Sequence, residues 1–335
     1  MRHWSVSQLN DANYCIMRYY LKKILKEPSI RLSVYAKGGF LHTTVEHFWE
    51  KHGDPHEVGK KKYDKKYSSP EQFTDYVKGK WSQFVMCDKK SKKPQDKKIA
   101  WRFEGEEWAI RNSFDKICPP LYKRLLEEGP PLYSELPFDY IINNIRFKGR
   151  IDEVRLKDGK VLIRDFKSGK SLFGGMKINH DPQLTLYNVS IGALCLGNKD
   201  FARSLGLEDR AKEFMGNPIY ISSDFVQEFF MLESCETFET SRKDKDYFEL
   251  LKMIKGTEET INSGNVYPEW GSKCDYCDMK IACEKKSSQP QNPCVDKKGN
   301  GLFDFIVPPL YARPIENSMP QGSFNFKNKK KIYVY

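Results

Sequence analysis

Long apolar runs are missing from this sequence, and their absence limits what the chain can be. No stretch of 18 or more apolar residues occurs, so no transmembrane helix is expected. The first residues lead into polar positions instead of an apolar signal core, so we expect no export signal. A phosphate-binding loop is also incomplete, because Arg164 stands where the Gly-Lys-Ser segment at 169–171 would need a glycine. We therefore expect neither an ATPase nor a helicase, and any unwinding motor would be a separate protein.

Cysteine usage and net charge limit the cellular compartment and the partners that we expect for this protein. The nine cysteines are an odd number, which favours reduced thiols or metal ligands over a disulfide framework. We therefore expect the protein in the cytoplasm, or in the host cytoplasm if it is viral. Lys and Arg number 56 against 45 Asp and Glu, a net charge of +11. Such a surplus fits either a polyanionic partner or ordinary solubility charge.

The spacing of apolar residues predicts helices at both ends of the chain and strands in its middle. Helices are expected at 5–26, 40–51, 71–86 and 101–128, the last with a break near Pro119-Pro120 because prolines interrupt helices. Three strands are expected at 133–142, 145–156 and 160–166, with turns at Asn143-Asn144 and Asp158-Gly159. Further elements are expected as a helix at 182–196, strands at 219–222 and 225–232, and a helix at 239–263.

Composition divides the chain into four expected parts. They are a helical lobe at 1–130, a strand-rich core at 131–265, a cysteine-rich segment at 266–284 and an irregular basic tail at 285–335. Lysine-rich insertions at 60–66 and 89–98 interrupt the helical lobe. They are either a surface for nucleic acid or solvated loops.

Two acidic residues are expected to converge on neighbouring strands of the core. The Asp158-Gly159 turn folds the strand carrying Asp152 back on the strand carrying Asp165. Converging carboxylates bind Mg²⁺ or Mn²⁺, which prefer oxygen ligands. Side chains alternate along a strand, so Asp165 and Lys167 share a face, while Phe166 points into the core and its carbonyl can be a further ligand. A lysine beside a metal can orient or deprotonate a water and stabilise charge on phosphorus.

These residues resemble the signature of the PD-(D/E)XK nuclease superfamily, read as Asp152 with Asp165-Phe166-Lys167. Three further matches resemble its RecB-like branch. Gln183 and Tyr187 lie four apart, hence on one helix face, as in a Gln-x-x-x-Tyr motif. The Gly39-x-x-His42 segment, with Glu46, resembles an N-terminal helix whose histidine binds metal. Glu135 lies on the preceding strand, where the branch often carries a glutamate.

The resemblance implies an α/β fold and a nuclease activity. The fold would be a restriction-endonuclease-like mixed sheet flanked by helices, with an N-terminal helical lobe. The protein would be a metal-dependent exonuclease acting on single-stranded DNA or DNA ends, in recombination, repair, phage replication or CRISPR adaptation. Asp152, Asp165, His42 and the Phe166 carbonyl would bind Mg²⁺ or Mn²⁺, and Lys167 would assist the water.

Within that implied site, Gln183 and Tyr187 would position the strand, with Glu135 beside them. The alternative is a subunit of a larger DNA-processing complex. Such a subunit would be active only with a recombination, helicase or CRISPR-adaptation partner, or would serve as a DNA-binding scaffold.

Four cysteines far apart in the sequence carry a second resemblance. Cys15, followed late in the chain by Cys274, Cys277 and Cys283, is similar to the iron–sulfur staple of RecB-like nucleases, among them CRISPR-adaptation exonucleases and the AddB nuclease domain. Four thiolates can hold a [4Fe–4S] cluster, which would close the domain by tying its first helix to its last segment. The competing interpretation is a zinc site in which Cys294 replaces Cys15.

Overall fold

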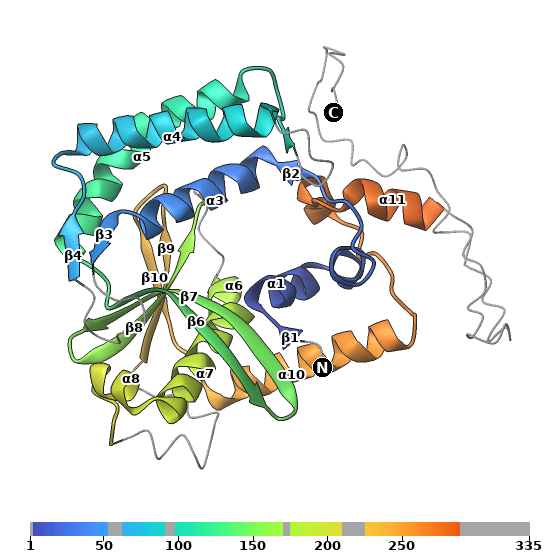
Figure 1. Cartoon of the computed structure of the whole chain (residues 1–335). Coiled ribbons are helices and arrows are strands. Elements are labelled where there is room, and N and C mark those ends of the chain that lie inside the picture. Colours follow the sequence, from blue (N-terminus) through green and yellow to red (C-terminus); the bar gives the residue numbers. More distant parts are fainter. Residues whose placement is uncertain (1–2, 53–61, 91–97, 170–174, 210–224, 289–335) are drawn as a thin grey trace, which may run out of the picture.

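The computed structural model describes residues 3–52, 62–90, 98–169, 175–209 and 225–288 (Figure 1). The strands are β1 (His3–Trp4), β2 (Arg31–Leu32), β3 (Trp49–His52), β4 (Lys62–Lys65), β5 (Ile99–Ala100), β6 (Tyr133–Ile142), β7 (Ile145–Lys157), β8 (Lys160–Lys167), β9 (Phe225–Met231) and β10 (Thr237–Thr240). The α-helices are α1 (Val6–Tyr14), α2 (Ile16–Tyr19), α3 (Ser33–Glu46), α4 (Pro70–Lys90), α5 (Glu106–Glu128), α6 (Gly175–His180), α7 (Pro182–Gly197), α8 (Lys199–Ser204), α10 (Asp244–Asn262) and α11 (Lys280–Ser288). Among the described residues, no helix has the length and apolar character needed to cross a membrane.

A mixed sheet lies at the centre and confirms the expected α/β architecture. Its strand order is β1-β7-β8-β9-β10. Strand β6 is off this path and pairs with β7 between Ile145 and Val154. The β6–β7, β7–β8 and β9–β10 pairs are antiparallel, whereas β1–β7 and β8–β9 are parallel. The two expected hairpin turns are present, because Asn143, Asn144, Asp158 and Gly159 all have positive φ angles between 50° and 74°. Two consecutive residues in this conformation make the tight turn that matches the twist of paired strands.

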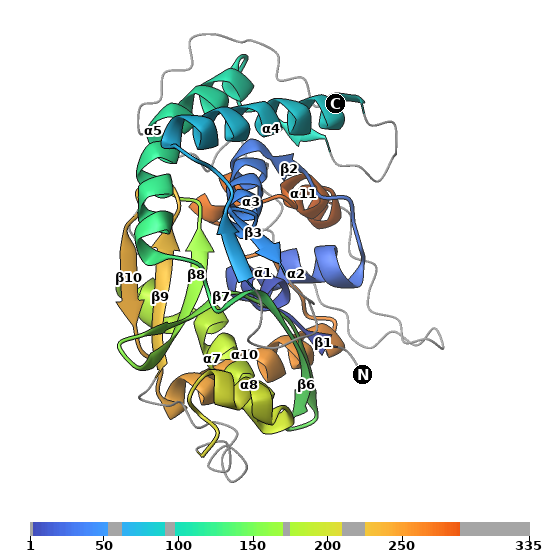
Figure 2. The same ribbon diagram turned by 60° about the vertical axis from the view of Figure 1, so that its left-hand side comes forward.

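Helices cover both faces of the sheet (Figures 1 and 2). Phe229 packs in a core with α7, α1 and α10, while its neighbour Phe230 packs in a second, aromatic core with α3, α4 and α5. Helix α7 is buried along most of its length, which explains its almost continuous apolar sequence. It begins with Pro182, and the Asp181 side chain accepts a hydrogen bond from the backbone N–H of Gln183.

A buried ion network holds the strands that will carry the site. The Arg164 guanidinium on β8 binds Glu228 of β9 at 2.5 Å, Glu153 of β7 at 3.0 Å and Glu128 of α5 at 2.5 Å. Arg155 binds the same Glu153 at 2.5 Å. Side chains alternate along strands, so this network lies on the face opposite to the neighbouring Asp152 and Asp165. These ion pairs therefore stabilise the central strands on the face of the sheet opposite to the two aspartates.

Several boundaries differ from the sequence predictions. The expected break at Pro119-Pro120 is wrong, since α5 continues through both prolines with a bend (Figure 2). Apolar residues on both sides of the prolines, including Ile117 and Leu121, are buried in the aromatic core, and this packing outweighs the lost backbone hydrogen bonds. The helix expected at 40–51 begins earlier, at Ser33, and ends at Glu46, because Trp49–His52 pairs as a strand with β4.

The helical prediction for 239–263 is wrong at its start. Residues up to Thr240 belong to β10, and the helix begins only at Asp244, where the Asp246 carboxylate accepts a hydrogen bond from the Lys243 amide. The helix expected at 5–26 is interrupted at Cys15, which has an extended backbone. The strand expected at 219–222 and the tail from 289 lie outside the described residues.

Candidate active site

The two predicted aspartates lie where β7 and β8 stop pairing. The ladder between these strands ends at the pair Glu153–Arg164, one residue short of Asp152 and Asp165. Beyond that point the Phe166 amide donates a hydrogen bond to the Asp152 Oδ2 atom at 2.9 Å, in place of a backbone partner on β7. The opened strand ends therefore present two carboxylates side by side, as the sequence predicts.

A connected polar network joins these carboxylates to Lys167 and to helix α7. Lys167 Nζ lies 2.6 Å from Asp165 Oδ2 and donates a hydrogen bond to Gln183 Oε1 at 2.8 Å. The Gln183 Nε2 group donates to Asp165 and to the Tyr187 hydroxyl, and the hydroxyl donates to Asp152 Oδ1 at 3.1 Å. Because Gln183 and Tyr187 are one helical turn apart, both reach the strand ends from one face of α7.

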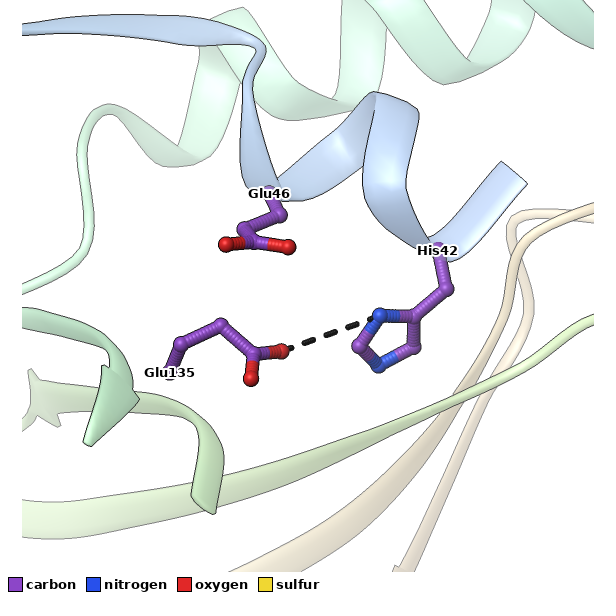
Figure 3. A group of neighbouring side chains, drawn as sticks. All are labelled: His42, Glu46 and Glu135. Atoms are coloured by element: carbon purple, nitrogen blue, oxygen red, sulfur yellow. Dashed lines mark ion pairs between the residues drawn. The ribbon is translucent and has the colours of Figure 1, made fainter. Parts of the chain in front are cut away.

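His42, Glu46 and Glu135 form the other side of the site (Figure 3). One ligand atom from each of the three lies within 4.8 Å of the others. His42 faces two carboxylates, with Nε2 at 3.0 Å from Asp152 and Nδ1 at 3.7 Å from Glu135. Glu135 has a positive φ of 52°, a strained conformation for a residue with a side chain, and such strain collects at functional sites.

Glu46 appears with His42 in the predicted motif, but it was not predicted to be a metal ligand or a catalytic residue. The sequence contains a signal for it, because Glu46 follows His42 by four positions and therefore lies on the same helical face. That spacing is common on exposed helices and does not by itself predict a metal ligand. The candidate ligand group is recognised only because Glu135 approaches from β6.

Burial and neighbouring charges raise the pKa of some groups in this site and lower the pKa of another. Burial, with the nearby Asp152 charge, raises the pKa of Asp165 to about 8 despite the presence of Lys167. Burial alone would raise the pKa of Asp152 as well, but the hydrogen bond and positive charge of His42 hold it below its ordinary value. Burial alone would lower the pKa of His42, whereas its hydrogen bond to Asp152 and the nearby carboxylates raise it to about 9.

The donor set fits a divalent cation with oxygen preference. Asp165 Oδ2 is buried and pairs with the Lys167 ammonium group at 2.6 Å. Burial and the Asp152 charge nevertheless raise the pKa of Asp165, so an added cation would favour the ionised form of this carboxylate. Burial and the Asp152 charge also raise the pKa of Glu135, so added positive charge would favour its ionised form.

Comparison with known families agrees with this geometry. The family model of the PD-(D/E)XK nuclease superfamily matches residues 3–284. The chain belongs to this superfamily. A search of the curated proteins found no match. Because the match runs from β1 into α11, it includes the sheet, the site and the cysteine segment of this nuclease.

The four predicted cysteines of the nuclease line a common pocket. Cys15, Cys274, Cys277 and Cys283 surround it together with Tyr14 and Trp270. Burial, together with the charges of the other three thiols, raises the pKa of Cys283 to about 11. Cys294, the ligand of the competing zinc interpretation, lies outside the described residues.

Polar contacts independently hold the cysteine segment against the first helices. Asp278 accepts from Arg18 at 2.8 Å and from Lys22 at 2.9 Å, and both cations also approach Asp11. Tyr35 donates to the Tyr276 carbonyl at 2.8 Å. The pocket of cysteines therefore sits in a seam that is closed by ion pairs.

Two adjacent glycines on α3 give a prediction about how the helix carrying His42 is seated. A Cβ atom at the buried Gly38 would collide with the Ser168 hydroxyl and lie 3.1 Å from Ser168 Cβ, whereas the exposed Gly39 has open space around it. We expect Gly39→Ala to raise the free energy of unfolding by roughly 0.5–1 kcal/mol through helix propensity. Gly38→Ala should lose that gain and lower nuclease activity, because α3 and Ser168, directly after β8, must move apart.

Thermal unfolding of both variants beside the wild type measures this difference. Equal stabilisation by the two substitutions would show that the contact with Ser168 does not seat the helix.

Proposed function

We propose that this nuclease is a metal-dependent DNA exonuclease that hydrolyses phosphodiester bonds in single-stranded DNA or at DNA ends. The observation that carries the proposal is the convergence of Asp152, Asp165 and Lys167 where β7 and β8 stop pairing. The net charge of +11 supports a polyanionic substrate. The superfamily match supports the nuclease reaction, and the resemblance to the RecB-like branch supports the choice of DNA and of ends.

Each residue has a proposed task in that reaction. Asp152, Asp165, His42 and the Phe166 carbonyl would hold Mg²⁺ or Mn²⁺, with Glu46 and Glu135 available on the other side of His42. The bound cation would withdraw charge from the scissile phosphate and acidify a nearby water. Lys167 Nζ would orient the attacking water and stabilise the charge that builds up on the phosphate oxygens. Gln183 and Tyr187 would hold the two aspartates and the lysine in position, because they bridge all three.

Substrate topology tests the exonuclease assignment. Purified protein should be incubated with Mg²⁺ or Mn²⁺ and either linear single-stranded DNA or the same sequence closed into a circle. An exonuclease shortens the linear strand progressively and leaves the circle intact. Rapid cleavage of the circle would instead establish an endonuclease at the same site.

We further propose that Cys15, Cys274, Cys277 and Cys283 hold a [4Fe–4S] cluster. The support is the shared pocket, because Cys15 at the end of the first helix lines it together with the three late cysteines. These four thiols are the ligand number that a cluster needs. Its positive iron ions would also offset the mutual repulsion that disfavours ionised thiols here.

The metal content of anaerobically purified protein tests the cluster. We expect brown protein containing iron, and colourless protein without iron for Cys15→Ala. Cys195→Ala provides a matched control, because Cys195 is buried in the main core away from the pocket. Stoichiometric zinc that survives Cys15→Ala would contradict the cluster and favour the site with Cys294.

A reducing compartment, the cytoplasm, is the proposed location. The support is chemical, since all cysteines among the described residues are free thiols, as is usual in compartments that keep thiols reduced.

A further inference from the structure

Helix α1 contacts both the cysteine pocket and the catalytic network. Its last residue, Tyr14, and the following Cys15 line the pocket, and its Leu9 and Ala12 side chains pack in the main core. Between them Asn10, which is half-buried, donates a hydrogen bond from Nδ2 to Gln183 Oε1 at 3.2 Å. Asn10 is not among the site residues that the sequence predicts.

The Gln183 side-chain amide has four polar partners. All four favour the same orientation of its oxygen and nitrogen atoms. Its oxygen accepts from Lys167 Nζ at 2.8 Å and from Asn10. Its nitrogen donates to the Asp165 carboxylate and to the Tyr187 hydroxyl at 2.9 Å. Turning the amide over would direct its oxygen at the carboxylate and its N–H groups at the ammonium group, so both charged contacts would become repulsive.

We propose that Asn10 is a positioning residue that acts through Gln183. This inference rests on the proposed nuclease function and adds a residue to its machinery. Without the Asn10 donor, the Gln183 oxygen retains one partner and the side chain can follow Lys167. Both Lys167 and Asp165 are held by that amide, so its displacement moves the two groups that act on the phosphate and the water.

Asn10→Ala and the isosteric Asn10→Asp test the inference by steady-state kinetics on a single-stranded oligonucleotide with Mn²⁺. Both variants lack the donor, so we expect kcat to fall about tenfold, the effect of one hydrogen bond, with KM for DNA nearly unchanged. Asn13→Ala is the matched control, because Asn13 is exposed on the same helix, and it should keep the wild-type kcat.

A double-variant cycle separates positioning from general loss of structure. In a Gln183→Ala background, Asn10→Ala should lower kcat by less than about twofold, because the group through which it acts is gone. The same fall as in the wild-type background would overturn the inference. So would a wild-type kcat for Asn10→Ala.

Melting temperatures give a readout that does not depend on catalysis. Asn10 and Gln183 share one hydrogen bond, so the shift for the double variant should be smaller than the sum of the two single shifts. Additive shifts would overturn the inference even if the isolated chain cuts no DNA. Failure of the wild type to cut would count against the proposed function alone.

Discussion

Asp165→Asn should lower the rate of DNA hydrolysis by at least about 10³-fold, since removing a metal ligand costs several kcal/mol of transition-state stabilisation. The substitution keeps the shape of the side chain and can still accept from Gln183, so the network around it should persist. What it removes is the buried negative charge beside Asp152. Single-turnover kinetics on labelled DNA measures this loss, and in steady-state kinetics KM should change far less than kcat.

The same substitution should make the metal-free protein more stable near neutral pH. Burial and the Asp152 charge raise the pKa of Asp165 to about 8 from an ordinary value of 3.8. The folded protein therefore binds this proton more tightly than the unfolded chain does. Its contribution to stability is fully present below pH 3.8 and is lost as the pH rises through about 8. Asp165→Asn removes this loss, so its melting temperature should fall less between pH 4 and 8.

Added Mn²⁺ should reverse the order of stability. The wild type gains stability from the cation that its folded state binds, whereas Asp165→Asn should gain little. Asp139→Asn is a suitable control, because Asp139 is exposed on β6 and pairs with Arg146. Equal stabilisation of wild type and Asp165→Asn by Mn²⁺ would show that Asp165 is not a ligand.

Arg164→Met should destabilise the protein by about 3–5 kcal/mol, the effect of breaking a buried ion pair from one side. The Arg164 side chain is 2% exposed, and its partners Glu153 and Glu228 are buried as well. Methionine fills much of the volume but leaves these carboxylates without their common cation. Urea denaturation followed by circular dichroism gives the free energy of unfolding.

Two further variants identify the cause of that loss. Combining Arg164→Met with Glu228→Gln should recover part of the stability, because one uncompensated charge is removed. Arg203→Met, which breaks ion pairs of an exposed arginine with Asp200 and Glu208, should have little measurable effect. If Arg164→Met were as mild as Arg203→Met, the buried network would not be what holds the central strands.

The sequence was most informative where local chemistry determines structure. The turns at Asn143-Asn144 and Asp158-Gly159 predicted the hairpins of β6, β7 and β8, and these are confirmed. The hairpin also brings Asp152 next to Asp165, since register follows from turn length. The side chain of Phe166 is buried, as its position between Asp165 and Lys167 predicted.

Features that depend on distant contacts were missed. The two-residue strand β1 is too short for any periodicity, and it is held by pairing with β7 and by the buried Trp4 side chain, which stacks on Tyr19. Pro119-Pro120 indicated a break, but packing against α3 and α4 keeps α5 continuous. Glu46 and Asn10 gain their meaning only from partners on other elements, Glu135 and Gln183.

Degradation of end-labelled single- and double-stranded DNA by anaerobically purified protein tests the central claim most directly. The reaction should be run with Mg²⁺, with Mn²⁺ and with excess chelator. The account predicts progressive shortening of DNA that requires a divalent cation and is absent with chelator. Folded, metal-loaded protein that leaves every end structure intact would contradict a nuclease centred on Asp152, Asp165 and Lys167.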